Sequence, residues 1–145
     1  DVVIDAYCGI GTISLTLARH VKKVYGVEVV PQAIVDAKEN AERNHITNAE
    51  FVCDDAGHFM TEFVERNEKV DCVMVDPPRK GCSTEFLERL TTLSPERIVY
   101  ISCNVATQAR DLTYLVEKGY KPLDVQPVDM FPHTPHIENI LLLSK

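Results

Sequence analysis

The sequence predicts an α/β fold: a doubly wound, mostly parallel seven-stranded sheet with helices on both faces. Short β-rich apolar runs alternate with helical stretches along the 145 residues. Several runs are continuously apolar, such as Cys72–Val75 and Ile98–Ile101, as is typical of parallel strands that are buried on both faces. Glycine-rich or polar segments follow these runs, at the positions where the carboxyl ends of parallel strands hold ligands.

The predicted strands are, in chain order, Val2–Ala6, Lys23–Val29, Glu50–Cys53, Val70–Val75, Arg97–Ser102, Leu123–Val128 and Ile137–Leu143. Helices are expected between the earlier strands. Pro31 begins the one over Gln32–Arg43, and Gly119 ends the one over Ala106–Lys118. Only the short segment Asp129–His136 separates the last two strands, so they are expected to form an antiparallel hairpin.

Composition favours a single domain, residues 1–145, that works inside a cell. With 45% hydrophobic residues the chain can bury one core, and its net charge of −7 argues against a self-sufficient nucleic-acid binder. No basic leader or apolar run of roughly 20 residues is present, so no membrane segment and a cytoplasmic location are expected. The apolar run beginning beside Asp1 indicates the C-terminal part of a longer protein. Five cysteines without a CxxC pair favour reduced thiols over disulfides or zinc.

The segment Asp5–Thr12 follows the first strand and contains Gly9 and Gly11, which allow a tight turn and close approach to a ligand. A dinucleotide-binding fingerprint has a further glycine-like position for a pyrophosphate, but Ser14 stands there. A ligand without phosphates fits this loop. Two adenosine cofactors, NAD and S-adenosylmethionine, are candidates, and of these only S-adenosylmethionine lacks phosphates.

Acidic residues end the next two strands. Glu28 stands where a carboxylate accepts hydrogen bonds from ribose hydroxyls. Asp54 and Asp55 end the third strand, and Asp55 is the preferred partner for an adenine amino group because strand alternation gives it the same face as Cys53. Each residue alone could simply solvate a loop end. Together with the glycine loop they favour a ligand site at the strands' carboxyl ends.

Two further strand ends carry candidate chemistry. Residues 76–81, Asp-Pro-Pro-Arg-Lys-Gly, follow the fourth strand, and the prolines stiffen a loop that can anchor a carboxylate. The alternative is a proline-capped strand end with a solvated basic pair. Cys103 ends the fifth strand between polar residues and directly before a helix, a location that can favour a reactive thiolate. Cys53 and Cys72 are expected to be inert core residues.

The chain resembles the RNA uracil-5-methyltransferase family, specifically its bacterial 23S ribosomal RNA members. The matching segments span nearly the whole chain: residues 5–12 (DAYCGIGT), 73–82 (VMVDPPRKGC), 102–104 (SCN) with 106–107 and 109–111, and 126–134 (QPVDMFPHT). The resemblance implies a class I, Rossmann-like methyltransferase domain, S-adenosylmethionine as cofactor and RNA as partner, with 23S ribosomal RNA favoured over transfer RNA.

The resemblance also implies roles for individual residues. Cys103 would be the nucleophile, Glu138 the base, and Asp76 a catalytic residue near both cofactor and uracil. The cofactor would be bound by Tyr7, Gly9, Gly11, Thr12, Glu28, Asp55 and Asp76. The RNA-contact candidates are Arg79, Lys80, Arg110 and His133. The family's upstream RNA-binding modules and a glutamine before the first strand are not in this chain. Val105 replaces a usual proline, and Asn139 stands where a small or thiol residue is common.

Methylation of carbon 5 of uracil requires a nucleophile and a base, independently of any resemblance. Carbon 5 of uracil is a poor nucleophile until a thiolate adds to carbon 6, and a base must later remove the carbon 5 proton. Without the resemblance, Glu138 is simply a polar residue on an edge strand.

Other interpretations remain open. An amino-group methyltransferase could use Asp76-Pro77-Pro78, although Arg79 replaces the aromatic residue that such enzymes place next. The chain could also be an NAD oxidoreductase. A further alternative is a module that binds cofactor or RNA without catalysis. No metal is expected, because His133 and His136 lack a further cysteine or carboxylate cluster.

Overall fold

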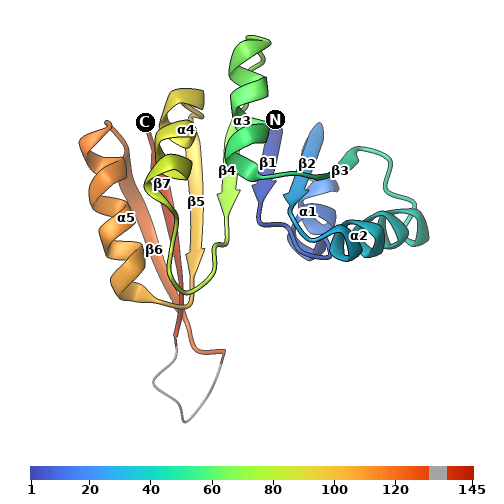
Figure 1. Cartoon of the computed structure of the whole chain (residues 1–145). Coiled ribbons are helices and arrows are strands. Elements are labelled where there is room, and N and C mark those ends of the chain that lie inside the picture. The colour runs from blue at the N-terminus through green and yellow to red at the C-terminus, as the bar shows by residue number, and fades with distance from the viewer. Residues whose placement is uncertain (131–136) are drawn as a thin grey trace.

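The computed structural model describes residues 1–130 and 137–145 as seven strands and five helices (Figure 1). The elements in chain order are β1 (Val2–Ala6), α1 (Thr12–Ala18), β2 (Lys23–Glu28), α2 (Pro31–Arg43), β3 (Ala49–Cys53), α3 (Ala56–Glu65), β4 (Cys72–Val75), α4 (Thr84–Leu93), β5 (Arg97–Ser102), α5 (Val105–Glu117), β6 (Lys121–Val128) and β7 (Glu138–Ser144).

The strands form one sheet in the order β3-β2-β1-β4-β5-β7-β6. The first five strands pair in parallel, and β7 is antiparallel to both of its neighbours, β5 and β6. The predicted mostly parallel sheet and the predicted closing hairpin are both confirmed. The strand order reverses between β1 and β4, and in open α/β sheets ligands bind at such a switch point, outside the carboxyl ends of the strands.

Helices cover the sheet on both faces, because alternate residues of each strand point to opposite sides. In β5, Ile98 and Tyr100 enter the core shared with α3, α4 and α5, whereas Val99 and Ile101 pack toward α1. A third cluster joins α1 and α2 to Phe51 of β3. Figure 1 shows the same arrangement, with α3, α4 and α5 in front of the sheet.

The element boundaries follow local hydrogen bonding. Pro31 opens α2 at its first turn, and Gly119 follows the end of α5 with a φ of 101°, both as predicted. The fourth strand begins at Cys72 instead of Val70. The preceding residue, Asp71, binds the start of β1: its backbone N–H donates to Val2, and its carboxylate accepts from the Val2 N–H at 2.7 Å.

Of the two cysteines predicted to lie in the core, Cys53 does not, whereas Cys72 packs against a core cluster but is only partly buried. Cys53 is exposed, because it ends β3, the strand at one edge of the sheet. Cys72 is only half-buried at the first position of β4. Apolar character alone led to the wrong prediction for Cys53, since burial depends on where in the sheet a strand lies.

None of the helices in the part of the chain that the structure describes combines the length and the apolar character needed to cross a bilayer.

Candidate functional site

The candidate site lies at the carboxyl ends of the parallel strands, at the lower edge of the sheet in Figure 1. The loop after β1 contains two glycines with left-handed backbones. Gly9 has a φ of 55° and nothing within 4 Å of where a Cβ would stand, so this position faces open space. Gly11 has a φ of 88°, and a Cβ there would meet the ring of Phe51 at 2.8 Å. Gly9 therefore provides an approach for a ligand, while Gly11 is required by packing.

Glu28 fixes this loop to the end of β2. Its Oε1 accepts from the Gly9 N–H at 3.2 Å, and its Oε2 accepts from the Val30 N–H at 3.1 Å. An ionised carboxylate has about four acceptor positions, so each oxygen can still accept a further hydrogen bond. Glu28 thus lies directly beside the open space at Gly9 and has acceptor capacity for a ligand hydroxyl.

Asp5 is a buried carboxyl that sequence reasoning did not assign to the site. It is 0% exposed, its Oδ2 accepts from the Ser14 hydroxyl at 2.5 Å, and its Oδ1 is buried without a hydrogen-bond partner among the described residues. Burial raises its pKa to about 6, and the nearby charge of Asp76 adds to the increase. An acidic residue inside the apolar run Val2–Ala6, directly before a glycine loop, was the available signal.

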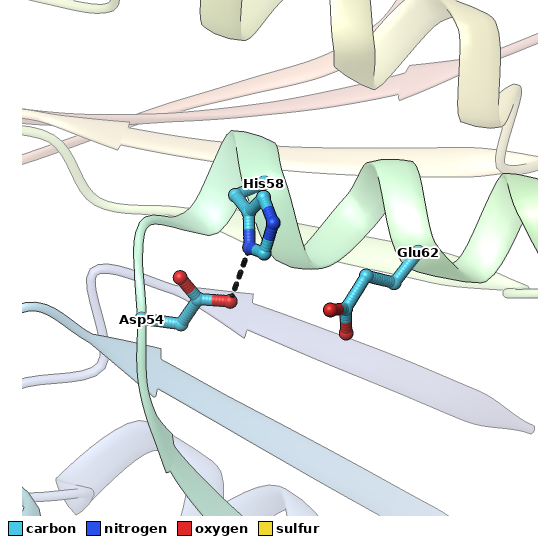
Figure 2. Close-up of side chains that lie close together, drawn as sticks. All are labelled: Asp54, His58 and Glu62. Carbon is cyan, nitrogen blue, oxygen red and sulfur yellow. Dashed lines mark hydrogen bonds and ion pairs between the residues drawn. The ribbon is translucent and has the colours of Figure 1, made fainter.

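The two predicted acidic residues after β3 have different local roles (Figure 2). Oδ2 of Asp54 lies 2.8 Å from Nδ1 of His58, and its Oδ1 accepts from the Asp55 N–H at 2.7 Å. Asp55 is the N-cap of α3, since its Oδ1 accepts from the His58 N–H at 2.9 Å. Its exposed Oδ2 makes no hydrogen bond to any described residue, so it can accept one from a ligand.

Figure 2 also shows Glu62, one helical turn beyond His58. Together with Asp54 these side chains bring three possible metal-ligand atoms within 4.8 Å of one another. The imidazole is 62% exposed, and its hydrogen bond to Asp54 raises its pKa. The group is therefore a solvated hydrogen-bonded cap at the start of α3, with a stronger base at His58 than an isolated histidine would be.

Tyr7 and Thr12 flank the glycine loop. Tyr7 has a φ of 62°, and its ring packs against that of Phe86 with centroids 5.3 Å apart. Burial, followed by the charges of Cys82 and Asp55, raises its pKa, which keeps the phenol neutral. Thr12 is exposed as the first residue of α1.

Asp76 and Glu138 approach each other from β4 and β7. Although Asp76 is exposed at the strand end, partial burial of its carboxyl raises its pKa, and the negative charge of Glu138 raises it further. The negative charge of Asp76 in turn raises the pKa of Asp5. Asp76 therefore lies within electrostatic range of both Asp5 and Glu138, and this negative charge at the strand ends favours a positively charged ligand.

Cys103 directly follows β5, and its side chain is half-buried, so its thiol is not sealed in the core. The flanking residues fix the turn: the Ser102 hydroxyl donates to the Asn104 carbonyl and accepts from its N–H, both at 3.0 Å. Oδ1 of Asn104 caps α5 by accepting from two backbone N–H groups. Ser102 pairs with Asn139 in the antiparallel ladder. Continued by one residue, that register places Cys103 opposite Glu138.

Side chains of α5 form hydrogen bonds with the backbone of the loop that follows β4. Asp111 is 1% exposed, and its Oδ2 accepts from the Cys82 N–H at 2.9 Å and from the Tyr100 hydroxyl at 2.6 Å. Arg110 donates to the Lys80 carbonyl at 2.9 Å and forms an ion pair with Asp111 at 3.1 Å. These bonds fix the segment that follows Asp76.

The predicted RNA-contact residues divide into three groups. Arg79 and Lys80 are exposed on the loop after β4. Arg110 belongs to the same surface, but its Nε and Nη2 bond Asp111 and loop carbonyls, which gives it a structural role that the sequence did not predict. His133 lies outside the described residues.

Comparison with known proteins identifies the family. The family model for tRNA (uracil-5-)-methyltransferases matches residues 1–145. The chain belongs to this family. An uncharacterized RNA methyltransferase of Bacillus cereus is 54% identical over the whole chain, and one of Staphylococcus aureus is 55% identical over 99% of it. The chain spans 32% of the length of each.

Solved structures place the fold among methyltransferases. A Pyrococcus abyssi tRNA (uracil-54, C5)-methyltransferase in complex with S-adenosyl-L-homocysteine has a TM-score of 0.82 and 36% identity, over 97% of this chain and 33% of that one. An rRNA methylase of Streptococcus thermophilus has a TM-score of 0.76 over the whole chain and 86% of its own, but its 19% identity supports the fold alone. The predicted family and the predicted class I fold are both confirmed.

Proposed function

We propose that residues 1–145 form the catalytic domain of an enzyme that methylates carbon 5 of a uridine in RNA, with S-adenosylmethionine as the methyl donor. The observation that carries the proposal is the last pair of the β5–β7 ladder, Ser102 with Asn139, because Cys103 directly follows the first of these residues and Glu138 directly precedes the second. A nucleophile and a base on neighbouring strands are the two groups that the reaction requires. Membership of the uracil-5-methyltransferase family supports the same reaction.

The residues at the switch point fit the cofactor. S-adenosylmethionine supplies an electrophilic methyl group on a positively charged sulfur when it is bound. Gly9 leaves open space for it, Glu28 offers acceptors to its ribose, and the spare oxygen of Asp55 can accept from its adenine amino group. The unpartnered Oδ1 of Asp5 and the carboxyl of Asp76 provide negative charge. Tyr7, Gly11 and Thr12 complete the proposed binding residues. The complex of the Pyrococcus abyssi protein with S-adenosyl-L-homocysteine supports the choice of cofactor.

The reaction assigns one task to each catalytic side chain. The Cys103 thiolate adds to carbon 6 of the uracil, which makes carbon 5 nucleophilic. After carbon 5 has gained its methyl group, Glu138 accepts the proton from that carbon. The electron pair of the broken C–H bond restores the ring double bond, and the Cys103 thiolate leaves. Asp76, on the rigid Pro77-Pro78 loop, orients uracil and cofactor toward each other.

We propose 23S ribosomal RNA as the substrate, ahead of transfer RNA, and the cytoplasm as the location. The resemblance of residues 73–82 to the ribosomal RNA members supports ribosomal RNA, whereas the Pyrococcus abyssi protein acts on transfer RNA. Arg79 and Lys80, with Arg110 and His133, are proposed to meet the RNA. A net charge of −7 supplies little attraction for phosphates, so the part of the longer relatives that this chain does not cover is proposed to supply most of the RNA affinity.

The test uses the full-length protein, RNA and cofactor with a labelled methyl group. Cys103→Ala is expected to abolish methyl transfer, because no adduct can form. Glu138→Gln is expected to accumulate a covalent protein–RNA adduct, because the carbon 5 proton stays in place. Cys72→Ala is the matched control, since its thiol lies at the amino end of β4. Unchanged activity of Cys103→Ala would refute the mechanism, and label on an exocyclic amino group would point to the amino-group alternative.

The substrate is tested separately. Mass mapping of 5-methyluridine in ribosomal and transfer RNA from cells with and without the gene should show one modified position that disappears from 23S ribosomal RNA. Loss from transfer RNA instead would reject the proposed substrate without touching the proposed reaction. Binding of RNA and cofactor with no turnover would support a module without catalysis.

A further inference from the structure

One pair of side-chain amides joins α5 to β7. Gln108 lies on α5 and is only 1% exposed. Its Nε2 donates to the carbonyl oxygens of Tyr100 at 3.1 Å and Asn139 at 3.0 Å, and its Oε1 accepts from Nδ2 of Asn139 at 2.7 Å. A glutamine amide has two N–H donors, so both are used. The Gln108–Asn139 pair therefore bonds β5 and β7 at the same time.

Both members lie next to the proposed catalytic groups. Asn139 directly follows Glu138 and pairs with Ser102 at the last position of the β5–β7 ladder. Gln108 lies one helical turn after Asn104, and its N–H donates to the Asn104 carbonyl at 3.1 Å. The pair thus connects the segment that carries the nucleophile to the segment that carries the base.

Glu138 itself lies beyond the last β5–β7 pair. There β7 pairs only with Val128 of β6, an edge strand whose other residues are all exposed. An edge strand of this kind offers little resistance to displacement. Among the described residues, the Gln108–Asn139 pair supplies the side-chain hydrogen bonds between β7 and α5.

We propose that the Gln108–Asn139 pair positions Glu138 for removal of the carbon 5 proton. The pair fixes the start of β7 relative to Cys103, so that the carboxylate and the thiolate act on the same uracil ring. Gln108 and Asn139 are positioning residues, because they act through the backbone of β7. The inference rests on the proposed function. It gives a task to Asn139, the residue directly after Glu138.

The inference concerns one step of the reaction. When the carbon 5 proton passes to Glu138, the C–H electron pair forms the C5–C6 double bond, and the Cys103–C6 bond breaks with its electrons returning to sulfur. Displacement of Glu138 slows this step alone. Addition of Cys103 and transfer of the methyl group precede it, so the methylated adduct should accumulate.

The experiment is a single-turnover assay with the full-length protein, RNA containing the target uridine and methyl-labelled cofactor. It measures the covalent adduct on a denaturing gel and the released methylated RNA. Gln108→Leu is expected to slow release from the adduct by about tenfold to a hundredfold, because a displacement near 1 Å can cost about a hundredfold in rate, while adduct formation changes little. Thr113→Val, exposed on the same helix, is the control and should behave like the wild-type protein.

A second variant separates positioning from simple stabilisation. Gln108→Leu alone leaves the Asn139 amide without its partner, whereas the double variant Gln108→Leu with Asn139→Ser removes both side-chain amides and so leaves neither of them unpaired. It is expected to accumulate the adduct as well. Release at the wild-type rate by the double variant, or equal slowing of adduct formation and release, would overturn the inference and leave the proposed function intact. Absence of any Cys103 adduct in the wild-type protein would reject both.

Discussion

At the scale of single residues, Asp5 combines a structural cost with a proposed binding role. Its carboxyl is fully buried in β1, and burial is the main reason for its pKa of about 6. The folded pKa lies above the ordinary value of 3.8, so the folded state holds this proton more tightly than the unfolded state. The contribution of Asp5 to stability is therefore greatest below pH 4 and is lost as the pH rises toward 6.

Asp5→Asn removes this charge while keeping an oxygen that can accept from Ser14. We expect the free energy of unfolding at pH 7 to rise by about 1–3 kcal/mol and its decrease between pH 4 and 6 to flatten. We also expect S-adenosylmethionine to bind about tenfold more weakly, because one negative charge near its positively charged sulfonium is lost. Urea denaturation and calorimetry measure the two effects. Asp124→Asn, on the exposed strand β6, is the control; equal behaviour of both variants would contradict the prediction.

The pair of Asp76 and Glu138 makes a second prediction at this scale. Glu138→Gln removes a like charge that raises the pKa of Asp76, so the pKa of Asp76 should decrease, although burial still holds it above its ordinary value. Carbon-13 NMR titration of the Asp76 carboxyl checks this. If the pKa of Asp76 is the same in the wild-type protein and in Glu138→Gln, the two carboxyl groups are too far apart to influence each other.

At the scale of elements, the loop after β4 depends on its contact with α5. Gly81 has a φ of 76°, and a Cβ there would stand 2.7 Å from Nη2 of Arg110 and 2.8 Å from Oδ2 of Asp111. The same side chains bind the loop through the Lys80 carbonyl and the Cys82 N–H. Any displacement of these side chains therefore moves the loop that begins at Asp76.

Gly81→Ala and Gly119→Ala form a matched pair. Both glycines have positive φ, but a Cβ at Gly119 would have nothing within 4 Å. We expect Gly119→Ala to cost about 1–2 kcal/mol from backbone strain alone. Gly81→Ala should cost about 3 kcal/mol or more, because it also disturbs the Arg110 and Asp111 contacts, and it should reduce methyl transfer. Thermal unfolding measures the stability of the two variants, and the methylation assay measures their activity. Equal losses of stability would show that the loop shifts readily to accommodate the added Cβ at position 81.

The elements also show what local sequence can predict. The apolar runs located all seven strands, because burial between two helical layers demands such runs. Their ends were less predictable: β4 begins at Cys72 because Asp71 bonds back to β1, a contact between residues 69 positions apart. Cys53 was assigned to the core by its residue type, yet it lies on an edge strand.

At the scale of the whole molecule, charge limits what this domain can do alone. The chain has a net charge of −7 and gathers carboxyl groups at its switch point, which suits a cationic cofactor but repels RNA phosphates. Residues 1–145 correspond to 32% of the length of the Bacillus cereus relative. The remaining two thirds of the longer protein are therefore expected to make most of the contacts with RNA.

We expect residues 1–145 alone to bind S-adenosylhomocysteine and not NAD, yet to methylate free RNA at less than about one hundredth of the full-length rate, because most phosphate contacts are missing. Calorimetry compares the two ligands, and incorporation of labelled methyl compares the two proteins. The same full-length protein at high salt is the control, since its rate should fall toward that of the isolated domain. A fully active isolated domain would contradict the role given to the rest of the protein.

The sequence by itself determined the fold class, the family and the residues that could do chemistry, because these are written in local apolar runs and short motifs. Only the tertiary structure decided how those residues meet. The Ser102–Asn139 pairing beside Cys103 and Glu138, the hydrogen bond that buries Asp5 against Ser14 and the Gln108–Asn139 pair all join segments that are separate in the chain. Strand order and helix packing create these contacts, and no local pattern of residues encodes them.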